Sequence, residues 1–190
     1  MYNSISNVYI IGRPIRVSVI ITVLYRRHHS MASEIISAVV PKSGRIEHNP
    51  DLCRGCRICE LVCSASHDEV CSSQLSRIHV LPNDLALEFP AQVCRQCDYP
   101  GCYYACPKKD KSLCIDKETG ARYINEEECI RCGSCYRACP FTPSLVFMHE
   151  QEGKKRYYKC DLCHGRTGGP FCVEVCPRDA LTYKPKGKSK

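Results

Sequence analysis

The sequence of 190 residues contains no apolar run long enough to cross a lipid bilayer. A membrane-spanning helix needs about 20 apolar residues, and the longest run, from Val17 to Leu24, has about eight. No small-residue cleavage site follows this run, and Arg26-Arg27 comes after the apolar stretch, whereas a twin-arginine export signal would place the pair before it. We therefore expect a cytoplasmic protein with no direct membrane insertion, which reaches a membrane only through a partner.

The sequence also lacks the residue groupings on which most catalytic sites depend. We find no paired carboxylates, no nucleophile next to a base and no glycine-rich phosphate-binding loop. We therefore expect a protein that catalyses no reaction by itself. The residue type that is most enriched relative to ordinary proteins is therefore the best guide to its function.

Cysteine is that residue type, with 18 copies in the chain. Such a density is typical of disulfide scaffolds and of metal proteins. Disulfides need an oxidising compartment, whereas closely spaced cysteines in a cytosolic protein are usually metal ligands. The lack of an export signal therefore favours metal binding.

Sixteen cysteines form four groups with a repeated spacing, and three of the groups end in Cys-Pro. The groups are Cys53-x2-Cys56-x2-Cys59-x3-Cys63, Cys94-x2-Cys97-x4-Cys102-x3-Cys106-Pro107, Cys129-x2-Cys132-x2-Cys135-x3-Cys139-Pro140 and Cys160-x2-Cys163-x8-Cys172-x3-Cys176-Pro177. The third group matches the bacterial ferredoxin motif at every spacing. The second and fourth widen one gap, and Ser64 replaces the proline in the first.

This spacing predicts [4Fe–4S] clusters. Three cysteines of such a loop bind three corners of one cube, and the fourth ligates another cluster. A structural zinc site uses two separated pairs, which would leave the third thiolate of each group without a role. The sixteen cysteines therefore predict four clusters. By spacing alone, the fourth ligands exchange either between groups one and four and between groups two and three, or between groups one and two and between groups three and four.

The predicted clusters change the meaning of the net charge. The formal charge is +7 with all cysteines counted as neutral. Sixteen thiolates add about −16 and four oxidised cores about +8, so the loaded protein carries about −1. A basic chain would suggest nucleic acid as a partner, but this correction removes most of that argument, and we expect no nucleic acid partner.

The chain is expected to consist of an extension, a cluster-binding domain and a basic tail. Residues 1–44 contain no cysteine and no clear period, so we expect a poorly ordered arm or a mis-called start upstream of Met31; the alternative is a strand or helix that packs on the domain. The domain spans residues 45–184, with residues 90–143 holding groups two and three, and the tail spans 185–190. We predict hairpins around 117–120 and Gly153, a last strand at 180–183, and a short helix at each Cys-x3-Cys step.

From about Ile46 to Tyr183 the chain resembles the four-cluster electron-transfer subunits of molybdenum and tungsten oxidoreductases, which include the dimethyl sulfoxide reductase and formate dehydrogenase iron–sulfur subunits. The resemblance implies an α+β fold with two ferredoxin-like halves around four clusters, and a role in anaerobic metabolism. It also implies the nested pairing. The four ligand sets are Cys53, Cys56, Cys59 and Cys176; Cys160, Cys163, Cys172 and Cys63; Cys94, Cys97, Cys102 and Cys139; and Cys129, Cys132, Cys135 and Cys106.

The segments 53–67, 76–80, 94–97 and 159–163 are similar to subunits that partner aldehyde ferredoxin oxidoreductase-type tungsten enzymes, including the benzoyl-CoA reductase complex. The implied partners are a catalytic tungsten or molybdenum subunit and a further electron-carrier subunit. The sequence departs from the family at Phe141-Thr-Pro-Ser, where many members carry Phe-Gly; no ligand is affected. The alternatives are a free polyferredoxin, a subunit of a hydrogenase or carbon monoxide dehydrogenase, and, more remotely, a zinc-binding structural protein.

Some residues outside the ligand sets also have a predicted role. Cys71 and Cys114 belong to no group, and we expect them to be small buried apolar residues. His67 follows Cys63 by four residues and is a candidate hydrogen-bond donor near a cluster, although an ordinary surface or core position is favoured. Cations beside ligands either raise cluster potentials or are solvated side chains; these are Arg54, Arg57, Arg95, Arg131 and Lys159.

Overall fold

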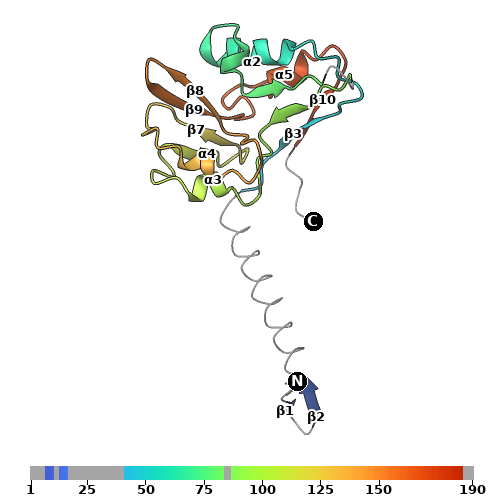
Figure 1. Ribbon diagram of the computed structural model, residues 1–190, viewed down its shortest axis with the longest axis vertical. Coiled ribbons are helices and arrows are strands. Elements are labelled where there is room, and N and C mark those ends of the chain that lie inside the picture. Colours follow the sequence, from blue (N-terminus) through green and yellow to red (C-terminus); the bar gives the residue numbers. More distant parts are fainter. Residues whose placement is uncertain (1–6, 11–12, 17–40, 84–86, 186–190) are drawn as a thin grey trace. The chain divides into compact units, whose positions relative to one another are not determined.

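The structure, a computed structural model, describes residues 7–10, 13–16, 41–83 and 87–185 (Figure 1). The chain divides into two compact units, residues 1–39 and 40–190. In the first unit, β1 (Asn7–Ile10) and β2 (Arg13–Arg16) form an antiparallel pair that the sequence did not predict. Met31 lies outside the described residues, so the start site and the boundary after residue 44 stay predictions.

The second unit consists of short antiparallel strand pairs and short helices, as expected for a small α+β fold. Among its described residues, four strand pairs are present: β3 (Arg45–His48) with β10 (Leu181–Lys184), β4 (Ile78–Val80) with β5 (Ala91–Val93), β6 (Leu113–Ile115) with β7 (Arg122–Ile124), and β8 (Phe147–Gln151) with β9 (Lys154–Tyr158). Its helices are α2 (Ile58–Asp68), the 3-10 helix Ser73–Leu75, α3 (Gly101–Tyr104), α4 (Ser134–Arg137) and α5 (Phe171–Glu174).

Both predicted hairpins are present, and their turns follow from local chemistry. Between β6 and β7, the Asp116 carboxylate accepts hydrogen bonds from the Thr119 amide at 2.6 Å and its hydroxyl at 2.7 Å. Gly120 then adopts φ +73°, and a Cβ there would lie 2.2 Å from the Lys42 carbonyl oxygen. Between β8 and β9, the two-residue turn Glu152-Gly153 has positive φ at both positions, which matches the twist of a tight hairpin.

The Cys-x3-Cys steps lie at helices, as predicted. α2 contains both Cys59 and Cys63, whereas α3, α4 and α5 each contain the first cysteine of the step and end before the second. α2 packs against α5, and α3 against α4. Helices from groups one and four therefore lie together, as do helices from groups two and three.

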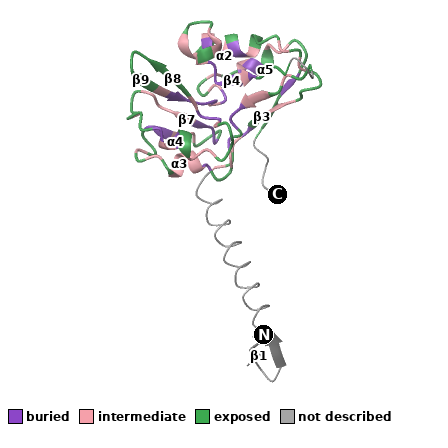
Figure 2. Ribbon diagram, viewed as in Figure 1, coloured by how far each residue is buried: buried purple, intermediate pink, exposed green. Residues whose placement is uncertain are grey.

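Buried residues are distributed over several of these elements (Figure 2), and five cysteines are among them. One buried cluster gathers Ile46, Ile78, Val93, Leu162 and Leu181 together with Cys63, Cys94, Cys160 and Cys172. A second, smaller cluster consists of Leu113, Cys135, Val146 and Tyr157. Thiols thus occupy places that aliphatic side chains fill in an ordinary core.

A network of ion pairs links α2 to β9, the strand that precedes the fourth cysteine group. Arg77 Nη1 donates to Asp68 Oδ2 at 2.8 Å, and Arg77 Nη2 to Glu126 Oε1 at 3.2 Å. Arg156 pairs with the same two carboxylates. Burial alone would raise the pKa of Asp68, but hydrogen bonds from Arg77 and Arg156 outweigh it and lower the pKa, so the carboxylate stays ionised.

No helix in the described ranges combines the length and the apolar character that a transmembrane span requires.

Candidate metal centres

The four cysteine groups share one backbone feature that the sequence did not reveal. In every group the residue two positions after the first cysteine is left-handed: Gly55, Gln96, Arg131 and Leu162 have φ of 66°, 50°, 58° and 61°. This conformation curls each Cys-x2-Cys loop so that successive N–H groups turn toward a concave side, an arrangement that suits anions. Three of the four residues are not glycine, so the chain accepts strain at equivalent places in three groups.

Two cavities each contain the four cysteines of one predicted ligand set, drawn from groups one and four. The first, the Cys53 site, is lined by Cys53, Cys56, Cys59 and Cys176, together with Pro177. The second, the Cys160 site, is lined by Cys160, Cys163, Cys172 and Cys63. In both cavities three cysteines come from one group and the fourth from the end of the other group.

Groups two and three meet in the same way. The third cavity, the Cys94 site, is lined by Cys94, Cys97, Cys102 and Cys139, with Pro140 beside them. The remaining set, the Cys129 site, comprises Cys129, Cys132, Cys135 and Cys106. Here Cys106 packs on the buried cluster that contains Cys135, and negative charge on Cys129 and Cys106 acts on the Cys135 thiol.

The sulfur atoms accept hydrogen bonds from the backbone. In the Cys160 site, the amides of Arg77 and Phe171 lie 3.3 Å from Cys63 Sγ and 3.4 Å from Cys163 Sγ. In the Cys94 site, the amides of Gln96 and Leu145 lie 3.5 Å from Cys94 Sγ and 3.3 Å from Cys139 Sγ. Such N–H···S contacts hold ligand thiolates in place and tune cluster potentials.

Burial disfavours the deprotonated, charged form of these thiols unless a positive charge lies nearby. Burial is the main cause that raises the pKa of Cys59 and of Cys135 to about 12 each and of Cys102 to about 11. Charge on neighbouring cysteines adds to the effect at all three. A metal ligand must be deprotonated, so iron bound at these sites would displace protons, and the metal would compensate the thiolate charge. The donor sets therefore fit [4Fe–4S] clusters, which supply one-electron transfer when bound.

Charge interactions between thiols indicate which of the four sites lie next to each other. Burial raises the pKa of Cys172 in the Cys160 site, and negative charge on Cys59 of the Cys53 site adds to it. Likewise, Cys94 raises the pKa of buried Cys160, and Cys102 raises that of Cys135. Thiols of the Cys53 and Cys160 sites, of the Cys160 and Cys94 sites, and of the Cys94 and Cys129 sites therefore lie close enough to interact.

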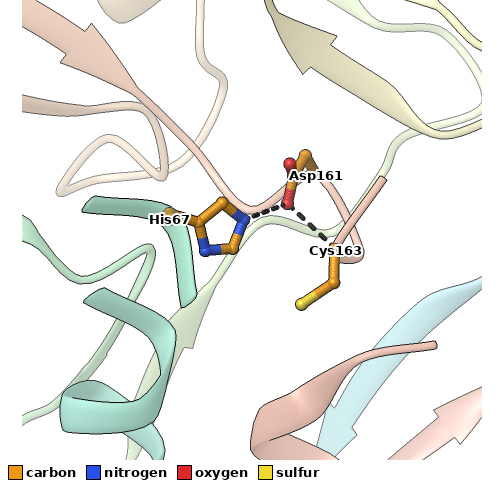
Figure 3. A group of neighbouring side chains, drawn as sticks. All are labelled: His67, Asp161 and Cys163. Carbon is orange, nitrogen blue, oxygen red and sulfur yellow. Dashed lines mark hydrogen bonds and ion pairs between the residues drawn. The ribbon is translucent and has the colours of Figure 1, made fainter. Parts of the chain in front are cut away.

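His67, Asp161 and Cys163 lie together beside the Cys160 site (Figure 3), with one ligand atom of each within 4.8 Å of the others. Asp161 Oδ1 accepts from His67 Nε2 at 3.0 Å and from the Cys163 amide at 3.0 Å. Burial alone would lower the pKa of His67, but hydrogen bonds with Asp161 and Cys63 raise it to about 10. His67 Nδ1 also lies 2.8 Å from the Cys63 carbonyl oxygen, so both ring nitrogens have hydrogen-bond partners beside the site. This is the hydrogen-bonding role, the less favoured of the two that the sequence suggested for His67.

The two cysteines outside the groups behave differently from the prediction. Cys71 is exposed, so its predicted burial was wrong; it follows the end of α2 in a surface loop. Cys114 is half-buried, and its thiol donates to the Lys111 carbonyl at 3.2 Å. Of the cations predicted beside the ligands, Arg54, Arg57, Arg95 and Arg131 are exposed, whereas Lys159 is buried. Sequence reasoning missed Arg122, which is 1% exposed.

The fold and the cysteine-lined cavities define an iron–sulfur protein built for electron transport, and comparisons with known proteins agree. The family described as "4Fe-4S dicluster domain" matches residues 85–185, which include groups two, three and four. The "Aliphatic sulfonate oxidoreductase, polyferredoxin-like subunit" of Pyrococcus furiosus is 42% identical over 128 residues, 67% of this chain and 68% of that protein. The chain belongs to the 4Fe-4S dicluster domain family.

One further relative and one solved structure are also similar to the chain. "Electron transport protein HydN" of Escherichia coli strain K12 is 34% identical over 154 residues, 72% of this chain and 85% of that protein. Among solved structures, an "Active site complex BamBC of Benzoyl Coenzyme A reductase" is 27% identical and covers 74% of this chain and 78% of that chain, with a TM-score of 0.43. A likeness at that TM-score defines neither the fold nor the partner of this chain.

Proposed function

We propose that the chain holds four [4Fe–4S] clusters and conducts electrons as the non-catalytic subunit of a cytoplasmic oxidoreductase. The observation that carries the proposal is the convergence of cysteines distant in sequence on common cavities, each with the composition of one predicted ligand set. The ligands are Cys53, Cys56, Cys59 and Cys176 for the first cluster; Cys160, Cys163, Cys172 and Cys63 for the second; Cys94, Cys97, Cys102 and Cys139 for the third; and Cys129, Cys132, Cys135 and Cys106 for the fourth.

The clusters form a wire with two accessible ends. The pairwise thiol interactions support an order in which the Cys53 and Cys129 sites are the ends, and each of these two sites contains an exposed cysteine, Cys56 and Cys132. Exposed apolar side chains surround these ends, with Ile58 39% exposed beside Cys59 and Ile130 53% exposed beside Cys129. Such surfaces suit docking of redox partners. The packing of α2 on α5 and of α3 on α4 supports two ferredoxin-like halves.

The partner at one end is a catalytic tungsten or molybdenum subunit, and the other end exchanges electrons with a further carrier. The resemblance of residues 53–67 to the subunits of tungsten enzymes supports this partner. The Pyrococcus furiosus relative is named as a subunit of an oxidoreductase, which supports a fixed enzyme complex. A free polyferredoxin is the second candidate, and the name of HydN, an electron transport protein, favours it.

Purification of a tagged chain from its native host under anaerobic conditions tests the partner. We expect one large subunit to co-purify in constant ratio, with tungsten or molybdenum in proportion to that subunit by mass spectrometry of the metals. A chain with Cys71 replaced by serine serves as the matched control, because Cys71 lies outside the four sites, and should retain the same partner. A fully iron-loaded chain that purifies alone would favour the free carrier instead.

A further inference from the structure

Arg122 lines the Cys94 site and is buried with most of its guanidinium unpartnered. Its Nη1 donates to the Gly120 carbonyl at 2.7 Å, whereas Nε and Nη2 have no hydrogen-bond partner. Burial of unpaired donors on a charged group is costly unless an anion compensates them. The cavity it lines is that of Cys94, Cys97, Cys102 and Cys139.

Lys159 is a second buried cation at the same site. It is 2% exposed, and its ammonium donates to the carbonyl oxygens of Arg122 and Cys160, the latter at 2.8 Å. Both partners are neutral backbone groups. Within the described ranges neither Arg122 nor Lys159 has a carboxylate within salt-bridge distance.

Gln96 fixes both cations relative to the cysteine loop. Its side-chain oxygen accepts from the Arg122 amide at 2.8 Å, and its side-chain nitrogen donates to the carbonyl oxygens of Arg122 at 3.3 Å and Cys160 at 2.8 Å. Gln96 is itself 3% exposed and left-handed, one of the four residues that curl the cysteine loops. These hydrogen bonds connect the Cys94-x2-Cys97 loop with strand β7 and with the segment that follows β9.

In the part of the chain that the structure describes, none of the other sites is lined by two buried cations without a salt-bridge partner. At the Cys160 site, Arg77 is neutralised by Asp68 and Glu126, and His67 is paired with Asp161. At the Cys53 site the lining arginines are exposed to solvent, and the buried Glu60 follows Cys59. Next to the Cys129 site, Arg131 and Arg137 are exposed. Water screens charge at the surface far more than in the interior.

We propose that Arg122 and Lys159 give the cluster at the Cys94 site the highest reduction potential of the four. An electron that enters the chain of clusters then resides preferentially on that cluster. The inference builds on the proposed function, because it requires a cluster at that site. One-electron reduction adds a negative charge to the cluster, and two fixed buried cations stabilise the reduced form more than the oxidised one. No proton transfer is involved.

An anaerobic redox titration followed by electron paramagnetic resonance tests the proposal. In the wild-type chain, the first cluster signal to appear as the potential is lowered should be the signal that Cys94→Ser removes or alters. If that first signal survives unchanged in Cys94→Ser, the proposal is overturned. This comparison needs no variant at the two cations and therefore holds even if such variants fail to load iron.

Variants that remove one positive charge provide a second test, in which the reduction potential of the same cluster is measured. Arg122→Gln and Lys159→Met should each lower the reduction equilibrium constant of that cluster at least about tenfold, a shift of about −59 mV for a one-electron couple. Arg122→Lys keeps the charge and should stay within about threefold of the wild type. Arg95→Gln is the matched control, because Arg95 lines the same site but is exposed, and should also change little.

The outcomes separate this proposal from the one on which it rests. A wild-type chain without a cluster at the Cys94 site would contradict the proposed function itself. A chain with all four clusters in which both charge-removing variants titrate like the wild type would overturn only the role of Arg122 and Lys159.

Discussion

Removal of iron is expected to unfold residues 45–184. The larger buried cluster includes Cys63, Cys94, Cys160 and Cys172 among its members, so part of the packing in this core depends on groups that the metal holds in place. Without metal, the four left-handed residues of the cysteine loops retain their strain, about 1–2 kcal/mol for each that is not glycine. Binding free energy is then folding free energy.

Circular dichroism during anaerobic chelation measures the effect. We expect the cooperative thermal transition to disappear in step with the loss of visible absorption near 400 nm, and to return when iron and sulfide are restored. A chelator treatment too mild to remove iron is the control and should leave the transition unchanged. An iron-free chain with a cooperative, native-like melt would contradict the expectation.

Cys94→Ser is expected to interrupt electron flow while the chain stays assembled with its partner. Cys94 is 8% exposed and, in the proposed order of clusters, belongs to an inner site between the Cys160 site and the Cys129 site. Loss or alteration of this one cluster leaves a gap between the Cys160 site and the Cys129 site, and electron tunnelling falls steeply with distance. The partner's own cofactor should remain intact.

The measurement is turnover with the physiological electron carrier, together with iron content and cluster spectra. We expect turnover to fall to a small fraction of the wild-type rate, with up to about four iron atoms lost per chain. Cys71→Ser, the exposed cysteine outside the groups, should match the wild type. Full turnover in Cys94→Ser with an altered cluster would mean that the four clusters are not arranged as a single wire.

Periodic signals and turn chemistry could be predicted from the sequence because they depend on neighbouring residues. The hairpins at 117–120 and Gly153 follow from Asp, Thr and Gly at fixed positions, and the short helices follow from the Cys-x3-Cys step. Cysteine spacing likewise defines which thiols belong to one loop. The partner of each fourth cysteine depends on packing between distant segments, so spacing alone left two pairings open.

The remaining features depend on tertiary contacts that leave no local signal. Nothing in Gln96, Arg131 or Leu162 marks a left-handed residue, because the closure of each loop imposes it. The local sequence around Arg122 predicts an ordinary strand residue. Its burial follows from the packing of β7 beside the second cysteine group. Cys71 shows the reverse error, since a cysteine outside the motifs was expected to be buried and lies in an exposed loop.

Iron and sulfide content per chain, measured after anaerobic reconstitution, tests the central claim most directly. Four cubes hold about sixteen iron and sixteen sulfide ions, and we expect these values in a preparation whose visible absorption has reached a plateau. Parallel determination of protein by amino-acid analysis sets the ratio. A plateau at about eight iron atoms or fewer would mean that the chain holds two clusters at most and would contradict the account of four.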